Sequence, residues 1–296
     1  MKTKRLLIPA SFLIAVLWGF KLLFLNGEED HTATRTPKQI KYGFSVQNKT
    51  NRLITDEKLW ISVPVKQNAY QSLIKITSND PYKLLTTEQG NQILEFEISE
   101  FPPFATWMIH VTADLLYTKN PIKAELKDIT PYLLPEAYIE SDHPDIRKLA
   151  GRLKGKTVYE TAFNIYNWVS VNIEYAGHIK NNRGALYALK NKKGDCTEFM
   201  SLFIALCRAS HIPARGIGGY TCADNCILKS GNYHNWAEFY DNGSWQIADC
   251  QKKVFARDHS NYIAMQILPL PDNQTSPMKG YSRFRVRGDS LKVKMK

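Results

Sequence analysis

The sequence lacks the motifs that mark several large functional classes. It has no nucleotide or flavin fingerprint, and no Cys-x-x-Cys with a second pair of ligands, as a zinc site would require. No nucleic-acid-binding motif accompanies the net charge of +11. The lysines and arginines are spread along the chain, which favours a solvated basic surface with some affinity for anionic membranes or polymers. We therefore expect no cofactor, no metal and no nucleic-acid partner.

Only one hydrophobic run approaches the length of a membrane span. Residues 6–25 follow a basic stretch and contain a single charge, Lys21. This pattern is typical of an export signal, and neither an Ala-x-Ala cleavage site nor a lipidation cysteine follows it. We expect residues 1–26 to be an uncleaved signal anchor, or else a cleaved signal peptide, followed by a polar tether at 27–39. The rest of the chain would then be exported, and the anchor would bind the membrane.

Cysteine is scarce, and the five residues present leave an odd thiol in an exported protein. Cys207 lies on the apolar face of a predicted helix, so we expect it to be a buried thiol. Cys222 and Cys226 flank a short polar loop. They can form a small disulfide with each other, or one of them can bond Cys250. These arrangements take Cys196 as the free thiol.

The first half of the chain alternates apolar and polar side chains, as half-buried strands do. The apolar positions of this alternation are Ile40, Tyr42, Phe44, Val46, Leu59, Ile61, Val63, Val65, Leu94, Phe96, Ile98, Trp107, Ile109, Val111, Ala113 and Leu115. Proline-containing turns at 79–81 and 102–103 interrupt it. We expect an antiparallel β-sandwich domain over 40–120 without a catalytic constellation, followed by a proline-containing linker at 121–141.

Helical periodicity begins near residue 144 and leads to the candidate thiol. A capping box at 157–160 opens one amphipathic helix. After Gly194, Asp195 is a good N-cap for a second, buried helix that runs to Ser210. Cys196 then lies in the first turn, at the positive end of the helix dipole. Such a position lowers the pKa of a thiol and favours the nucleophilic thiolate.

A hairpin follows this helix. Two alternating runs flank Asn242-Gly243, which is the strongest short-range hairpin signal. In that register His234 and Asp249 become diagonal neighbours on one sheet face, about 7 Å apart at Cβ. A shift of one residue would place them on opposite faces. Asp249 can then fix the tautomer of His234, and His234 can accept a thiol proton, as a cysteine nucleophile requires.

Several motifs occur in a fixed order along residues 140–255. They are Gly194-Asp195-Cys196, the stretch Arg208 to Arg215, Gly219-Tyr220, His234-Asn235-Trp236 and Trp245-x-x-x-Asp249. Their order and spacing closely resemble the transglutaminase-like superfamily, whose core has its Cys, His and Asp in this order. Two features depart from the family pattern. Cys250 stands where the family usually has proline, and the loop at 221–233 resembles an insertion.

This resemblance implies an α+β fold: a papain-like transglutaminase core over 142–270, with a cysteine helix packed on an antiparallel sheet, preceded by the all-β sandwich domain. It also implies that Cys196 is the catalytic nucleophile, His234 the general acid/base and Asp249 the histidine orienter. The carboxyl end at 271–296 alternates basic and apolar residues. We expect a strand followed by a solvated basic tail.

The expected activity is acyl transfer at amide bonds of peptides or proteins through a Cys196 thioester. Bacterial members that this chain resembles are mostly regarded as peptidase-like, which favours hydrolysis by a cysteine peptidase or amidase. The alternative is a protein-glutamine transglutaminase, in which an amine resolves the thioester. A non-catalytic peptide-binding module is the third possibility, although it leaves the three residues at family spacing without a purpose.

Overall fold

The structure is a computed structural model that describes residues 35–178, 181–268, 276–278 and 280–296. The predicted signal segment at 1–26 lies outside these residues, as does most of the predicted tether. Strand β1 already begins at Arg35. Residues Thr36–Lys296 form one compact unit. Within the described ranges, no helix is both long enough and apolar enough to cross a membrane.

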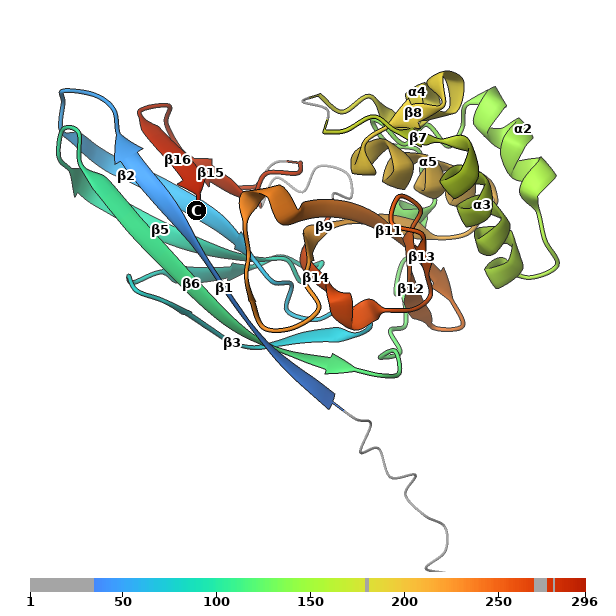
Figure 1. Cartoon of the computed structure of the whole chain (residues 1–296), viewed down its shortest axis with the longest axis horizontal. Helices are drawn as coiled ribbons and strands as arrows, with labels where there is room; N and C mark the ends of the chain where they lie inside the picture. The colour runs from blue at the N-terminus through green and yellow to red at the C-terminus, as the bar shows by residue number, and fades with distance from the viewer. Residues whose placement is uncertain (1–34, 179–180, 269–275, 279) are drawn as a thin grey trace, which may run out of the picture. The chain divides into compact units, whose positions relative to one another are not determined.

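The amino-terminal strands form two sheets around one hydrophobic core (Figure 1). In one sheet β1 lies beside β6, which lies beside β3; in the other, β5 lies between β2 and β4. The bounds are β1 (Arg35–Asn48), β2 (Ile54–Val63), β3 (Gln71–Ser78), β4 (Lys83–Thr86), β5 (Gln92–Phe101) and β6 (Thr106–Thr118). Because side chains alternate between the faces of a strand, a strand such as β6 contributes every second residue of its central part to the core.

The predicted apolar positions of this region are buried, except for the half-buried Trp107. Two strands, β3 and β4, carry no comparable pattern in the sequence. Most of their side chains are exposed or half-buried, so burial imposes little alternation on them. Hydrophobic periodicity therefore identified the strands that line the core and missed those at the sheet margins.

At the basic carboxyl end we expected a strand followed by a solvated tail, and the structure has two strands there, the second reaching Met295. They are β15 (Phe284–Val286), which pairs with β2, and β16 (Leu291–Met295), which pairs with β1. Val293 and Met295 pack against the sandwich core, whereas Lys292 and Lys294 are exposed. The alternation of lysine with apolar residues is thus that of a strand with one buried face. Lysines on an outer strand also hinder unwanted edge-to-edge pairing.

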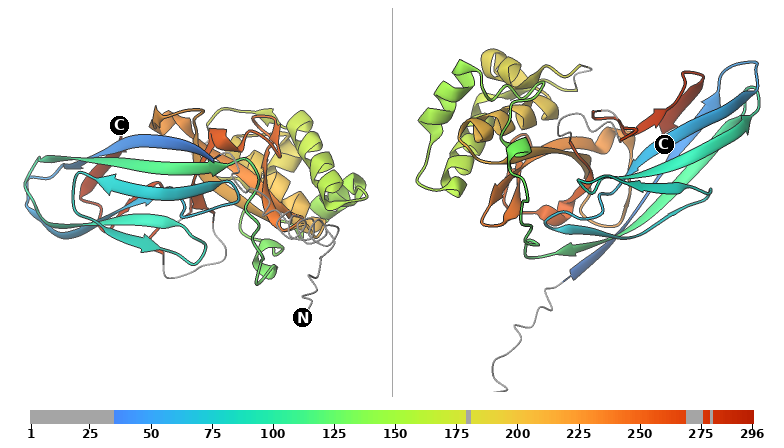
Figure 2. Two further views of the ribbon diagram at one scale, coloured as in Figure 1. Left: turned by 90° about the horizontal axis from the view of Figure 1, so that it is seen from below. Right: turned by 180° about the vertical axis from the view of Figure 1, so that it is seen from behind.

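The second part of the fold consists of helices on one face of an antiparallel sheet (Figure 2). Its helices are α2 (Pro144–Leu153), α3 (Val158–Asn172), α4 (Gly184–Asn191) and α5 (Cys196–Ala209). Its sheet has the order β13 (Val254–Phe255), β12 (Ser244–Asp249), β11 (Tyr233–Asp241), β9 (Ala214–Thr221) and β14 (Tyr262–Ile267). Helix α5 lies between the other helices and strands β9 and β11. The predicted α+β fold, with a cysteine helix on an antiparallel sheet, is confirmed.

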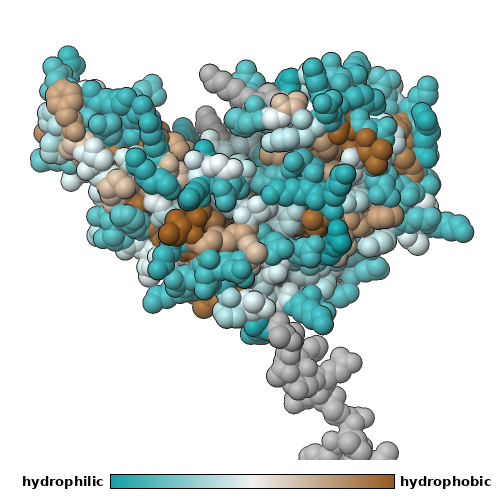
Figure 3. Space-filling view, in the orientation of Figure 1, coloured by the Kyte–Doolittle hydropathy of each residue, from teal (hydrophilic) through white to brown (hydrophobic). Residues whose placement is uncertain are grey.

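Short elements connect these parts. They are the 3-10 helices η1 (Thr130–Tyr132), η2 (Ser230–Asn232) and η3 (His259–Asn261), and the two-residue strands β7 (Glu174–Tyr175), β8 (Lys193–Gly194) and β10 (Cys226–Ile227). Strand β7 pairs with β8, which directly precedes α5 in the chain, and β10 pairs with Ile40 and Lys41 in the middle of β1. On the face shown in Figure 3, hydrophilic residues predominate and hydrophobic ones form only small patches.

The sheet face opposite the helices packs against the sandwich. Tyr220, Ile263 and Met265 of this sheet belong to the sandwich core. Backbone hydrogen bonding crosses the same boundary, since the amide of Val65 donates to the carbonyl of Ala264 in β14. Strand β14 is therefore held by β9 on one side and by residues of the amino-terminal β region on the other.

Candidate active site

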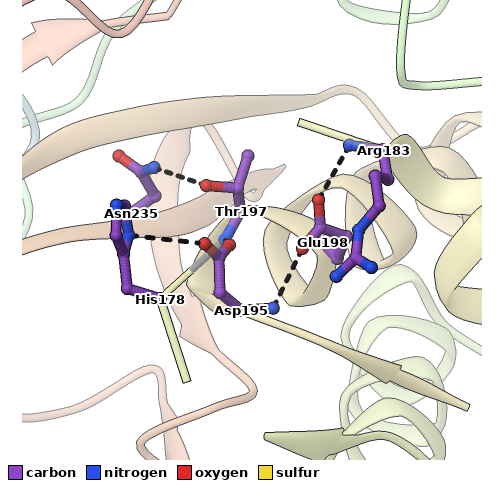
Figure 4. A network of polar contacts seen from close by, with 6 residues as sticks. All are labelled: His178, Arg183, Asp195, Thr197, Glu198 and Asn235. Atoms are coloured by element: carbon purple, nitrogen blue, oxygen red, sulfur yellow. Dashed lines mark hydrogen bonds and ion pairs between the residues drawn. The ribbon is translucent and has the colours of Figure 1, made fainter. Parts of the chain in front are cut away.

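The loop before α5 is fixed by a buried carboxylate. Asp195 caps the helix as predicted, and its Oδ1 accepts the amide of Thr197 at 2.8 Å. Glu198 completes a capping box, since its Oε2 accepts the amide of Asp195 at 2.9 Å. Its Oε1 accepts the amide of Arg183 at 2.9 Å, so that one side chain joins two loops (Figure 4). Sequence reasoning missed Glu198, although the acidic residue three positions after the cap was the available signal.

Cys196 is the first residue of α5 and is half-buried. Its thiol interacts with the backbone amide of Asn235 and with the Thr197 side chain, and both hydrogen bonds favour the thiolate. Burial and the neighbouring Asp195 carboxylate outweigh them and raise the pKa of the thiol to about 11. The predicted lowering of this pKa is therefore wrong. The positive end of α5 favours the thiolate, but partial burial and the acidic neighbour of its first turn favour the neutral thiol more strongly.

The hairpin has the predicted register. Asp241 pairs with Ser244 across Asn242-Gly243, and both turn residues have positive φ, as a type I′ turn requires. Nε2 of His234 lies 2.6 Å from Oδ2 of Asp249. The two side chains are 6% and 2% exposed, so their attraction is little screened by water. The predicted approach of these two residues is confirmed.

Two further groups hold the carboxylate of Asp249. The hydroxyl of Tyr262 donates to Oδ2 at 2.8 Å, and the amide of Lys252 donates to Oδ1 at 3.0 Å. Sequence reasoning missed Tyr262, because the strand that carries it was not predicted and no motif marks it. Trp236 packs edge-on against the Tyr262 ring with centroids 5.0 Å apart.

Asn235 connects the hairpin to the cysteine helix. It follows His234 in β11, its backbone amide interacts with the Cys196 thiol, and its Nδ2 donates to Thr197 Oγ1 at 2.9 Å (Figure 4). The structure thus brings the start of α5 to the start of β11. Because Asp249 occupies Nε2 of His234, Nδ1 is the ring nitrogen available for proton exchange. A thiol, an imidazole and a carboxylate in this order are suited to nucleophilic chemistry.

The remaining cysteines adopt one of the predicted arrangements. Cys222 and Cys226 form a disulfide with each other, whereas Cys207 and Cys250 are free and buried. Burial raises the pKa of both free thiols well above the ordinary value. Among the residues that the structure describes, no group of three or more His, Cys, Asp or Glu side chains could hold a metal ion.

Comparison with known proteins supports the family resemblance. Residues 147–250 match the model of the transglutaminase-like superfamily. Among solved structures, the chain is similar to a candidate cysteine protease from Cytophaga hutchinsonii, with 20% identity, a TM-score of 0.59, and coverage of 88% of this chain and 92% of that one. At this identity the likeness concerns the fold alone.

Two other similarities are weaker. The periplasmic domain of TgpA from Pseudomonas aeruginosa has 14% identity and a TM-score of 0.39, covering 74% of this chain and 91% of that one. Red sea bream transglutaminase has 13% identity and a TM-score of 0.30, and the alignment covers 70% of this chain and 48% of that one. Among curated proteins no sequence matches this chain. On the sequence match and the fold together, the chain carries a domain of the transglutaminase-like superfamily over residues 147–250.

Proposed function

We propose that this protein is an enzyme that transfers acyl groups from peptide or protein amide bonds through a thioester on Cys196. In this proposal His234 is the general acid/base and Asp249 orients it. The observation that carries the proposal is the buried contact of 2.6 Å between His234 and Asp249, at the strand end that meets the first turn of the cysteine helix. The next residue, Asn235, supports the proposal as well, since its backbone amide contacts the Cys196 thiol.

The raised pKa of Cys196 decides how the first step runs. The thiol is protonated at neutral pH, so Nδ1 of His234 takes its proton as the sulfur attacks the amide carbonyl. Asp249 stabilises the imidazolium that forms. His234 then gives this proton to the departing nitrogen as the C–N bond breaks. An amine leaves, and the acyl group remains on Cys196 as a thioester.

Negative charge develops on the carbonyl oxygen during this step. The backbone N–H of Cys196 is well suited to bind that oxygen, since the first amides of a helix have no partner within the helix and lie at its positive end. The capping contacts of Asp195 and Glu198 fix the orientation of this turn before any substrate binds. A rigid loop here would lower the barrier, because donors that are already aligned need not reorganise.

The second step determines the biological activity. If water attacks the thioester, His234 accepts a proton from the water, the C–S bond breaks, a carboxylic acid is released and the proton passes from His234 to the Cys196 sulfur. If an amine attacks instead, a new amide forms and the protein is a transglutaminase. We favour hydrolysis, because the bacterial members that the motifs resemble are mostly regarded as peptidase-like. The substrate would then be an exported or surface-associated peptide or protein.

We further infer that the enzyme works outside the cytoplasm and is attached to a membrane. The basic stretch and apolar run at 1–26 support this location. The disulfide between Cys222 and Cys226 supports it as well, because disulfides persist mainly in oxidising compartments.

The test uses the full chain in a mild detergent with a mixture of peptides in heavy-oxygen water, with and without a fluorescent primary amine. We expect new peptide termini that carry the heavy oxygen, and none with Cys196→Ala. Cys207→Ala is the matched control, since it removes a buried thiol from the same helix and should stay active. Amine-labelled glutamine without new termini would assign transamidation. If a folded protein forms neither product, the enzymatic proposal is refuted.

A further inference from the structure

We propose that Tyr262 is a positioning residue for the catalytic pair, and that the amino-terminal β-sandwich holds Tyr262 in place. This inference rests on the proposed function. Tyr262 lies in β14, outside the superfamily match that ends at residue 250, and no motif of the chain points to it. Its hydroxyl and Nε2 of His234 both contact the same oxygen, Oδ2 of Asp249.

The geometry leaves Asp249 little freedom. Oδ2 is held at 2.6 Å by His234 and at 2.8 Å by Tyr262, and Oδ1 accepts the Lys252 amide at 3.0 Å. Contacts on both oxygens fix the plane of the carboxylate, and with it the direction in which the imidazole is held. A carboxylate that is only 2% exposed also depends on such donors, because water cannot replace them.

Tyr262 is itself held from several sides. Its backbone carbonyl accepts the hydroxyl of Tyr117, from sandwich strand β6, at 2.9 Å. Ala264 lies two residues further along β14. Its amide donates to Oε1 of Gln71, from β3, at 2.9 Å, and its carbonyl accepts from Nε2 of the same side chain at 3.1 Å. Trp236 packs against the Tyr262 ring on the side of the hairpin. Side chains from two sandwich strands and one hairpin strand therefore fix the position of one hydroxyl.

This arrangement gives the sandwich a part in catalysis. One hydrogen bond joins Tyr117 of the sandwich to the backbone of Tyr262, and the side-chain hydroxyl of Tyr262 bonds Asp249, which in turn contacts His234. Loss of the Tyr262 hydroxyl would leave His234 bonded to a carboxylate that can rotate. The imidazole would then point at the thiol less often. Substrate binding would change little, since the hydroxyl contacts Asp249 and not the cysteine helix.

The experiment compares Tyr262→Phe with wild type in the full chain, using a peptide substrate found with the test above. The change removes one oxygen and keeps the ring that packs on Trp236. We expect kcat to fall about tenfold or more, the loss of one hydrogen bond to a charged group, with KM changed less than about twofold. Tyr220→Phe is the matched control. It removes a buried hydroxyl from β9 in the same sheet, where its partner is the sulfur of Met295.

A second readout does not need activity. Proton NMR of the full chain with labelled histidine reports the Nε2 proton that His234 shares with Asp249, identified by its loss in His234→Ala. In Tyr262→Phe we expect this resonance to broaden or move upfield, while Tyr220→Phe leaves it in place. If wild type shows the resonance but no activity, the proposed function fails and the positioning role stands.

Tyr117→Phe covers the case in which Tyr262→Phe does not fold. It keeps the Tyr262 hydroxyl and removes the contact with its carbonyl, so we expect a smaller effect of the same kind on kcat and on the resonance. An unchanged kcat and an unchanged His234 resonance in folded Tyr262→Phe would overturn the inference. If Tyr262→Phe cannot be obtained folded, the same two unchanged values in Tyr117→Phe would overturn it.

Discussion

The ionisation of Cys196 gives the sharpest prediction. Burial and the Asp195 carboxylate raise the pKa of this thiol from 9.0 to about 11. A rise of about two units makes the thiolate about a hundredfold rarer at pH 7 than in an unperturbed cysteine, which corresponds to about 2.7 kcal/mol. Cys196 should therefore be slow to react with an alkylating reagent at neutral pH. Raising the pH is the perturbation that should restore its reactivity.

The raised pKa of Cys196 also makes the free energy of unfolding fall as the pH rises. A thiol with a raised pKa in the folded state keeps its proton after the unfolded chain has lost it. The neutral thiol therefore contributes its full stabilisation below about pH 9. This contribution is lost as the pH rises from about 9 to about 11. Thermal unfolding measured across this interval should show a decline that Cys196→Ala reduces.

The assay is alkylation with iodoacetamide at intervals from pH 6 to about pH 10, with the labelled Cys196 peptide measured by mass spectrometry. Because the thiolate is the reactive form, the rate should rise about tenfold per pH unit without a plateau. The chain unfolded in denaturant gives the reference rate for each cysteine peptide. Cys207 and Cys250 are fully buried and serve as internal controls that should label more slowly than Cys196.

One result would refute this reasoning. Rapid labelling of Cys196 below pH 7, with a plateau that disappears in His234→Ala, would mean that the resting protein holds a thiolate–imidazolium pair. Attack by the sulfur would then need no prior proton transfer. The helix end and His234 would have outweighed burial, and the expectation drawn from the sequence would be correct.

Three further predictions follow from contacts around the site. Asp249→Asn should lower kcat by about three to four orders of magnitude with little change in KM, because the amide favours the wrong imidazole tautomer; steady-state kinetics measures this. Glu198→Ala leaves two backbone amides without their acceptor and should cost about 2 kcal/mol, lowering Tm by about 5 °C in a thermal melt. Arg215→Met leaves Glu238, its partner at 2.7 Å, buried and unpaired, and should cost about 3–5 kcal/mol in denaturant unfolding; the double change with Glu238→Leu should recover most of it.

The sequence predicted those parts of the site that local patterns specify. Asn242-Gly243 determined the hairpin register, and with it the approach of His234 to Asp249. Tyr262 could not be predicted, because its role depends on how β14 packs between β9 and the sandwich. The ionisation of Cys196 could not be predicted either. A pKa depends on the water and charge around the sulfur, which only the folded chain defines.

The pairing of β16 with β1 has a consequence for how the protein is made. The first described strand lies against the last one, with Phe44 opposite Met295, and nearly the whole described chain lies between them. Contacts so distant in sequence form slowly, since a long loop must close first. The edge of β1 therefore stays open until residues 291–295 have been synthesised. Until then its unpaired backbone is a template for misassembly, and the sandwich is completed only after the region of helices α2 to α5 has been synthesised.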